Sequence, residues 1–304
     1  MNKRGVGSAG PQNKRVVVVS NSSSGGSDEE LLDRIGERLS VLGEIERVEP
    51  QSVESFGDEV RAALASDQDL IVAAGGDGTM NCLLNGFEGD LAGRTFGLVP
   101  MGTGNDLART LAIDPDPVAA ADQIVAGTEV DLDVGRATGG EVTQLFINAC
   151  MGGFPVKVNK AIDGDVKERF GPLAFWVGGL RAAADLTRWQ VKVGDDAYDD
   201  VVAIGVGNGK TAGGGITVWP DAVPDDGALD LCILPAEGVG SALRIAASVK
   251  RGAHREIEGV VFKRAARFEI SAYPELEFNC DGELIELTAP VTFELVDRLR
   301  MRVP

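Results

Sequence analysis

Asp69-Leu70-Ile71-Val72-Ala73-Ala74 runs directly into Gly75-Gly76-Asp77-Gly78-Thr79, so that an apolar segment ends in a glycine-rich turn. The arrangement recurs where Thr95-Phe96-Gly97-Leu98-Val99-Pro100 precedes Gly102-Thr103-Gly104-Asn105-Asp106. Short apolar runs bounded by turn residues are typical of buried strands. Glycines at the carboxyl end of a strand allow a tight turn that brings backbone N–H groups against an anion. Two such turns on neighbouring strands predict a cradle for a phosphorylated ligand.

Each turn also contains a carboxylate. Asp77 and Asp106 are groups that can hold Mg²⁺ or a hydroxyl, which favours phosphoryl transfer over simple binding. Either turn alone is compatible with an ordinary strand-to-helix connection, but their joint occurrence argues against that interpretation. Neither turn matches the P-loop or the G-x-G-x-x-G pattern, so a P-loop or Rossmann assignment is disfavoured.

The first part of the chain alternates strand and helix patterns. Leu31, Leu32, Ile35 and Leu39, for example, recur at helical spacing. We expect further strands at 16–20 and 45–48, and helices at 28–42, 55–65, 79–85, 105–111 and 117–126. This order predicts a doubly wound, mainly parallel sheet with its ligand at the carboxyl edge of the strands.

From about Asp131 strand-like segments dominate. They lie at 145–149, 190–193, 201–205, 228–234, 266–272, 276–279 and 291–296, separated by turns rich in Gly, Asp and Pro. This succession of short strands and turns indicates an antiparallel sandwich. We therefore expect an α/β domain at 15–132, completed by a returning last strand at 290–304, and an all-β domain at 133–289. Residues 1–14 are polar and basic, and are expected to form a disordered leader.

Composition narrows the function classes. The chain has 304 residues and a net charge of −18, which argues against a nucleic-acid partner because phosphates would be repelled. No apolar run is long enough to span a membrane, and the apolar run after residue 14 is too short for a signal peptide, so a cytoplasmic location is expected. The excess of acidic residues resembles that of proteins adapted to high salt, an interpretation that stability at molar KCl would support.

Zinc-binding and thiol chemistry receive little support, which leaves chemistry based on carboxylates and another metal. Cys82, Cys150, Cys232 and Cys280 are scattered without CxxC spacing, and His254 is the only histidine. A zinc site is therefore not expected. We expect reduced, mostly buried thiols, and we expect His254 to lie in an exposed loop or at a helix end.

Taken together, the motifs resemble the catalytic domain of diacylglycerol kinases and the related bacterial-type lipid kinases. The resemblance begins with Gly75–Asn81 and Pro100–Ala108. It continues through Phe146–Asn148, Gly152–Phe154, Gly207–Gly209, Ala212–Gly215, Pro220–Ala222, Asp225–Asp230 and Asp281-Gly282-Glu283, in the family's order over roughly residues 15–300. It implies a Mg²⁺-dependent kinase that transfers the γ-phosphoryl of ATP to a lipid hydroxyl of the diacylglycerol type, a reaction of phospholipid metabolism. It also implies an NAD kinase/diacylglycerol kinase-like nucleotide-binding domain and a β-sandwich that binds lipid and metal.

For the nucleotide, the resemblance implies that the two turns bind the phosphates and ribose of ATP, largely through backbone N–H groups. The implied residues are Gly75, Gly76, Asp77, Gly78, Thr79, Met80, Asn81, Gly102, Thr103, Gly104 and Asn105. Asp77 and Asp106 are further implied to be catalytic, holding Mg²⁺·ATP or the acceptor hydroxyl.

For the second domain, the resemblance implies that Asp226 and the carbonyls of Val223 and Ala228 bind a second, structural Mg²⁺. A β-turn is the plain alternative for Asp225–Gly227, and the two interpretations are compatible. Glu283 is implied to be the general base on the lipid hydroxyl, with Asp281 beside it. Which of these two carboxylates takes the proton stays open.

The chain departs from the family pattern in two places. Asn21–Gly26 offers N–H and hydroxyl groups where the family often has a lysine. The threonine expected to touch nucleotide is not evident at Pro50–Ser55, where Ser52 or Ser55 could substitute.

Lipid contact is best sought at 155–186, where basic residues lie beside Phe170, Phe175 and Trp176. A packed helix with a solvated charged face is the alternative. Transient membrane contact, a homodimer and the identity of the lipid all stay open.

Two other functions stay open. An NAD kinase also carries a Gly-Gly-Asp-Gly-Thr turn, although Gly102–Asp106 and Asp281-Gly282-Glu283 favour the lipid kinase. A non-catalytic nucleotide-binding regulator would keep Gly75–Thr79 without needing Glu283 or Asp226, and it would bind ATP without turnover.

Overall fold

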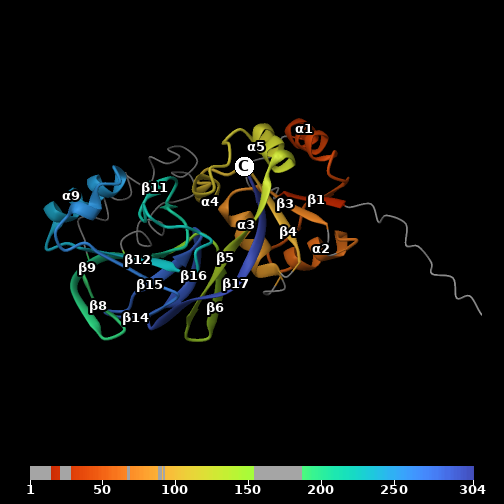
Figure 1. Ribbon diagram of the computed structural model, residues 1–304. Coiled ribbons are helices and arrows are strands. Elements are labelled where there is room, and N and C mark those ends of the chain that lie inside the picture. Colours follow the sequence, from red (N-terminus) through yellow and green to blue (C-terminus); the bar gives the residue numbers. More distant parts are fainter. Residues whose placement is uncertain (1–14, 21–28, 67–68, 88–90, 92, 154–186) are drawn as a thin grey trace, which may run out of the picture.

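The computed structural model describes residues 15–20, 29–66, 69–87, 91, 93–153 and 187–304. These residues form an α/β lobe and a β-rich lobe that lie side by side (Figure 1). The predicted fold class is confirmed: a parallel sheet flanked by helices is followed by an antiparallel β domain.

The α/β lobe follows the predicted alternation of strands and helices. Its elements are β1 (Arg15–Ser20), α1 (Glu29–Leu39), β2 (Glu44–Val48), α2 (Phe56–Ala63), β3 (Leu70–Gly75), α3 (Asp77–Gly86), β4 (Thr95–Pro100), α4 (Asp106–Thr110) and α5 (Pro117–Ala126). The strands lie in the order β2-β1-β3-β4, all parallel. Parallel pairing therefore brings the carboxyl ends of β3 and β4, and the turns that follow them, to one edge of the sheet.

Both faces of this sheet are covered, as a doubly wound fold requires. Helices α1 and α5 pack on one face, where Ile35 and Ile124 contact the cluster that contains Val72. Helices α2 and α3 pack on the other face, where Val60 and Leu83 join a second cluster. Strands β3 and β4 are buried throughout, which explains their continuous apolar runs.

The β-rich lobe is antiparallel. Its elements are β5 (Thr128–Gly139), β6 (Val142–Phe146), β7 (Ala149–Gly153), β8 (Trp189–Val193), β9 (Asp196–Gly207), β10 (Thr211–Ala212), β11 (Ile216–Thr217), β12 (Leu229–Pro235), α9 (Val239–Lys250), the 3-10 helix η2 (His254–Glu256), β13 (Val261–Ala265), β14 (Arg267–Tyr273), β15 (Glu277–Cys280), β16 (Glu283–Thr288) and β17 (Val291–Val303). The strands enclose a core of aliphatic residues with Phe146, Phe278 and Phe293.

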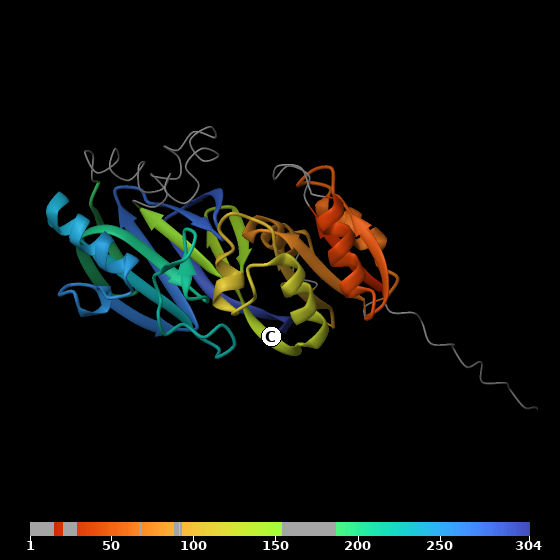
Figure 2. The ribbon, with the colours of Figure 1, turned by 90° about the horizontal axis from the view of Figure 1, so that it is seen from above.

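The final strand connects the two lobes. β17 pairs with β14 near its start, and near its end Arg300 and Met301 pair in parallel with Thr95 and Phe96 of β4. β5 accompanies β17 from one lobe to the other, as the two views show (Figures 1 and 2). The domain limits 15–132, 133–289 and 290–304 stay predictions.

Several local predictions are wrong. The single strand expected at 145–149 is divided into β6 and β7, with Ile147 and Asn148 between them. Strand β5 and helix α9 were not expected from the sequence. His254 is fully buried instead of exposed, because its Nε2 lies 2.9 Å from the Val218 carbonyl and its ring packs on Phe262.

The cysteines also differ from the prediction. Cys150 and Cys280 form a disulfide, whereas Cys82 and Cys232 are not disulfide-bonded. The predicted leader, the loop Asn21–Gly26 and the predicted lipid-contacting segment 155–186 lie outside the described residues. In the part of the chain that the structure describes, no helix is long and apolar enough to cross a bilayer.

Candidate functional site

The two glycine-rich turns touch each other. The backbone N–H of Met101 donates to the carbonyl of Gly75 at 3.0 Å, which extends the β3–β4 pairing into the turns. A Cβ atom on Gly102 would lie only 2.6 Å from the Cα of Gly76. Glycine at 102 is therefore required for this close approach of the two backbones.

Asn105 closes the second turn. Its backbone is left-handed, with a φ of 51°. Its side-chain amide donates to the carbonyl of Gly102 at 2.6 Å and its Oδ1 accepts the N–H of Gly102 at 3.1 Å. Asn is one of the few residues that adopt this backbone conformation readily, so the residue type and the turn are matched.

Asp77 joins the first turn to the second. Its carboxylate accepts the backbone N–H of Asp106 at 2.9 Å and that of Leu107 at 3.0 Å. Burial, together with a smaller effect of the carboxylates of Asp106 and Asp281, raises the pKa of the Asp77 carboxyl to about 6 against the effect of these two donors. A pKa raised in this way is common among carboxyl groups at functional sites.

Asp106 connects the α/β lobe to the β-rich lobe. Its buried carboxylate accepts the N–H groups of Gly214 and Gly215 at 2.8 and 2.7 Å. The Thr211 hydroxyl donates to the Asp106 carbonyl at 3.2 Å. The β10–β11 hairpin is thus held against the start of α4.

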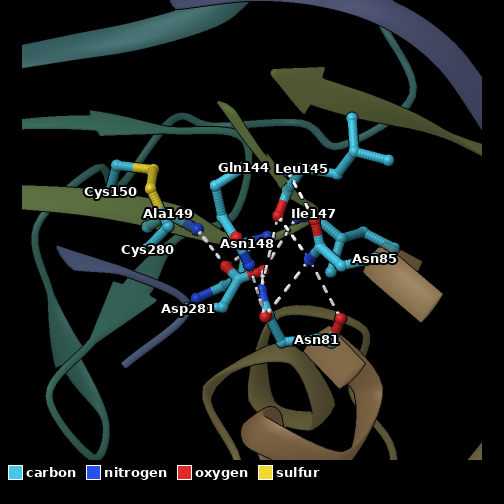
Figure 3. The surroundings of a disulfide bond; sticks show 10 residues. All are labelled: Asn81, Asn85, Gln144, Leu145, Ile147, Asn148, Ala149, Cys150, Cys280 and Asp281. Atoms are coloured by element: carbon cyan, nitrogen blue, oxygen red, sulfur yellow. Dashed lines mark hydrogen bonds between the residues drawn. A yellow bond between two sulfur atoms is a disulfide. The ribbon is translucent and has the colours of Figure 1, made fainter. Parts of the chain in front are cut away.

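Asp281 lies in a cradle of backbone donors between β6 and β7 (Figure 3). Its carboxylate accepts the N–H of Ile147 at 2.9 Å, that of Asn148 at 3.0 Å and that of Ala149 at 2.9 Å. Burial raises the pKa of Asp281, whereas these donors favour the ionised form. The interruption between β6 and β7 directs these three N–H groups to one carboxylate, and this explains why no continuous strand forms at 145–149.

Asn81 on α3 points to the same carboxylate. Its amide donates to Asp281 and to the carbonyl of Leu145, both at 3.3 Å, and its Oδ1 accepts from Gln144 at 2.8 Å. Asn85, one helical turn later, donates to the Leu145 carbonyl and accepts its N–H. The polar end of the Asn81 side chain is therefore engaged within the protein.

A polar chain connects Asp281 with Asp106. Asn148 accepts from the Thr110 hydroxyl at 3.1 Å and donates to the carbonyl of Thr211 at 2.8 Å. Thr211 in turn donates to Asp106. The structure thus brings Asp77, Asp106 and Asp281 to one place between the lobes, although they come from three distant parts of the sequence.

The other sequence-predicted residues take different positions. Met80 packs in the core of the α/β lobe, Thr79 is buried against Gly75, and Thr103 is exposed in the second turn. Glu283 is the first residue of β16, where its backbone pairs with Cys280, but its side chain lies outside the described part. Ser52 and Ser55 lie in an exposed turn before α2 with their hydroxyls 3.1 Å apart.

The turn predicted to bind metal is held partly by ion pairs. The carboxylate of Asp226 is partly exposed. It accepts the N–H of Ala228, in the same turn, at 3.1 Å, and it forms an ion pair with Arg264. Arg264 also lies 4.0 Å from Asp230, one of whose oxygens is buried without a hydrogen-bond partner among the described residues. Burial raises the pKa of Asp230.

The donor set at this turn limits which metal would fit. Within the described ranges, no three His, Cys, Asp or Glu side chains form a metal-binding group. A cation at Asp226 would therefore be coordinated by a carboxylate, backbone carbonyls and water. That oxygen-only set fits Mg²⁺, which keeps several waters, better than zinc.

Asp133 is a site residue that the sequence analysis missed. Its buried carboxylate accepts the N–H of Gly227 at 2.6 Å and pairs with Arg298 at 3.1 Å, while its own N–H donates to the Pro224 carbonyl at 2.7 Å. It anchors both sides of the Asp226 turn. The sequence feature that could have identified Asp133 is the position of an acidic residue between Leu132 and Val134, in an apolar part of a strand.

Comparison with known proteins agrees with this architecture. Residues 15–137 match the diacylglycerol kinase catalytic domain, and residues 148–300 match the YegS C-terminal NAD kinase beta sandwich-like domain. The chain is 31% identical over 234 residues to a diacylglycerol kinase of Bacillus subtilis, covering 75% of this chain and 76% of that one. It is 30% identical over 241 residues to a diacylglycerol kinase of Staphylococcus epidermidis, covering 76% and 74%.

Solved structures show the same fold. A diacylglycerol kinase structure from Bacillus anthracis superimposes with a TM-score of 0.78 at 25% identity, covering 96% of this chain and 98% of the other.

Proposed function

The chain belongs to the family that carries the diacylglycerol kinase catalytic domain, and on that premise we propose that it transfers the γ-phosphoryl group of ATP to the hydroxyl of a lipid. The observation that carries the proposal is the contact between the two glycine-rich turns, with Asp77, Asp106 and Asp281 grouped beside it. A simple nucleotide-binding module has no need for three carboxylates gathered next to its phosphate cradle.

The triphosphate would lie against the first turn. Helix α3 begins at Asp77, within the first glycine-rich segment, so the N–H groups at its start and its dipole favour an anion there. The Gly76–Gly102 approach places two backbone segments without side chains next to each other at the start of this helix. Binding by N–H groups is consistent with the absence of a lysine in the Asn21–Gly26 sequence.

We assign the Mg²⁺ that accompanies ATP to the neighbourhood of Asp77, and the structural Mg²⁺ to Asp226 with the carbonyls of Val223 and Ala228. When bound, Mg²⁺ would neutralise charge that builds up on the transferring phosphoryl group. Asp133 would support the second site by holding the turn, since it anchors both Gly227 and Pro224.

Glu283 is the general base in this proposal, and Asp281 is a residue that positions it. Both oxygens of Asp281 already accept backbone N–H groups, which leaves that carboxylate poorly placed to approach a substrate hydroxyl. Glu283 lies two residues further on, at the start of β16. It would remove the proton of the lipid hydroxyl as the oxygen attacks the γ-phosphorus and ADP leaves.

The experiment is transfer of label from [γ-³²P]ATP into lipids in mixed micelles, with Mg²⁺, at low and at molar KCl. The panel contains a diacylglycerol, a sphingoid base, phosphatidylglycerol and an archaeal-type ether lipid, because each presents a primary hydroxyl near an apolar tail. Glu283→Gln should abolish transfer while ATP binding persists. Glu258→Gln, at an exposed position, is the matched control and should retain transfer.

The same assay separates the alternatives. Label in NAD and in no lipid would indicate an NAD kinase. ATP binding without transfer to any acceptor would indicate a nucleotide-binding regulator. Co-sedimentation with liposomes tests for transient membrane contact, and light scattering tests for a homodimer.

A further inference from the structure

The disulfide lies next to the Asp281 cradle (Figure 3). Cys150 on β7 and Cys280 on β15 face each other across an antiparallel pair, 130 residues apart in the chain, and both are 0% exposed. Ala149 precedes Cys150, and Asp281 follows Cys280. The covalent bond therefore joins the two short segments that hold the Asp281 carboxylate.

Two hydrogen bonds connect the same two segments as the disulfide. The N–H of Asp281 donates to the carbonyl of Ala149 at 2.8 Å, and the N–H of Ala149 donates to the Asp281 carboxylate at 2.9 Å. Asp281 has a left-handed backbone with a φ of 49°, a conformation that its surroundings must maintain. Fixing its neighbour Cys280 to β7 restricts the backbone at this position.

The β15–β16 hairpin has a short paired segment with the rest of the sheet, while its side chains Phe278 and Leu287 are buried in the core. Among the described residues, no strand pairs with the far side of β16, and β15 pairs with β7 through Phe278, Asn279 and Cys280. The β15–β16 register also shifts between Phe278 and Asn279. The crosslink therefore joins β15 to β7 within this short paired segment, next to Asp281.

We propose that the Cys150–Cys280 disulfide is a redox-sensitive positioning device for Asp281, and through it for Glu283 at the start of β16. In the oxidised protein the hairpin is fixed and the Asp281 cradle is complete. In the reduced protein the hairpin moves relative to β7, and the fraction of molecules with Asp281 in place falls. The effect on phosphoryl transfer rests on the function proposed above, whereas the effect on the cradle does not.

The redox step is ordinary thiol–disulfide exchange. The thiolate of an external dithiol attacks one sulfur, breaks the S–S bond and forms a mixed disulfide, which the second thiol of the reductant resolves. Two electrons and two protons pass to the protein, leaving two cysteine thiols and an oxidised reductant. Because both sulfurs are buried, attack requires the hairpin to open first, and reduction should therefore be slow and accelerated by mild denaturant.

The test uses the Cys82→Ala/Cys232→Ala variant, in which the disulfide contains the only remaining cysteines. Thiol titration should find none after air oxidation and two after complete reduction. Native-state hydrogen exchange should show the amides of Ile147, Asn148, Ala149 and Asp281 exchanging about 10-fold or more faster after reduction, while β1 and β3 stay unchanged. Additional Cys150→Ala and Cys280→Ala substitutions should reproduce the reduced behaviour and abolish the response to reductant.

Kinetics test the positioning role. Reduction should lower kcat by about 10-fold or more with little change in KM for ATP, because the glycine-rich turns are not involved, and re-oxidation should restore it. Two titratable thiols after air oxidation, or unchanged exchange and unchanged kcat after complete reduction, would overturn the proposal. If the protein lacks transfer activity in both states, the proposed function fails while hydrogen exchange still decides whether the disulfide holds the cradle.

Discussion

Asp77 and Asp106 are joined by a hydrogen bond of 2.9 Å from the backbone N–H of Asp106 to the Asp77 carboxylate. The acidic residue of the first glycine-rich turn thus fixes the start of the helix that follows the second. The two turns therefore form one structural unit, and a substitution at either residue should alter the conformation of both turns.

The raised pKa of Asp77 predicts how stability depends on pH. Folding raises this pKa from 3.8 to about 6, so between these pH values the folded protein holds a proton that the unfolded chain has released. Stability should fall as pH rises through this window, by about 2–3 kcal/mol from this group. Asp77→Asn should lack this contribution. Urea unfolding of both proteins at several pH values from 4 to 7 measures the difference, and parallel pH profiles would contradict the prediction.

Gly102→Ala should separate the two turns. The new Cβ would meet the Gly76 backbone at 2.6 Å, so the backbone must move, at a cost of about 1–3 kcal/mol. ATP affinity, measured by calorimetry, should fall strongly. Gly240→Ala on α9 is the matched control, since no described atom of a neighbouring element lies within 4 Å of the new Cβ, and the stability of this variant should rise or stay unchanged. Equal ATP affinity in both variants would argue against the turns as the phosphate cradle.

Asp133→Asn should weaken the Asp226 turn. The Asp133 side chain is 4% exposed and pairs with Arg298, whereas Asp131 on the same strand is 45% exposed and pairs with Arg300. We expect a loss of about 1–3 kcal/mol for Asp133→Asn because it weakens a buried charged interaction. The control Asp131→Asn breaks a surface pair and should cost less than about 1 kcal/mol.

Asp133→Asn should also raise the Mg²⁺ concentration required for half-maximal activity, while Asp131→Asn should leave it unchanged. A titration of activity with Mg²⁺ measures this. Identical Mg²⁺ dependence in the two variants would separate Asp133 from the metal site.

Asp281→Asn should be costly although it is nearly isosteric. An amide can present only one oxygen to the three N–H groups of Ile147, Asn148 and Ala149, and its NH₂ would face a donor. We expect a loss of about 2–3 kcal/mol and strongly reduced transfer. Asp195→Asn, in an exposed turn, should stay within about 0.5 kcal/mol of the parent protein. Thermal unfolding of both variants provides the comparison.

The parts of the fold that were predicted correctly depend on local patterns. Continuous apolar runs identified β3 and β4, and helical spacing of leucines identified α1. The helix at 79–85 and the one at 105–111 were placed within a few residues because glycine turns mark where helices begin. Strand β5 was missed because half of its residues are polar and it pairs mainly with the distant β17.

The wrong predictions concern residues that are buried although no local pattern in the sequence indicates burial. His254 lies in a charged stretch of sequence, but packing against Val218 and Phe262 buries it. Cys150 and Cys280 lack the short spacing that marks many cysteine sites, and only the β7–β15 pairing brings them together.

The sequence by itself determined the parallel α/β lobe, the β-rich lobe, the two glycine-rich turns and the acidic residues to examine, because strand periodicity and turn chemistry are properties of neighbouring residues. Only the tertiary structure decided what those residues contact. Asn81 and Asp281, 200 positions apart, share a hydrogen bond, and Asp133 proved to anchor the Asp226 turn. Such contacts depend on strand order and register across the two lobes, and no short window of sequence contains that information.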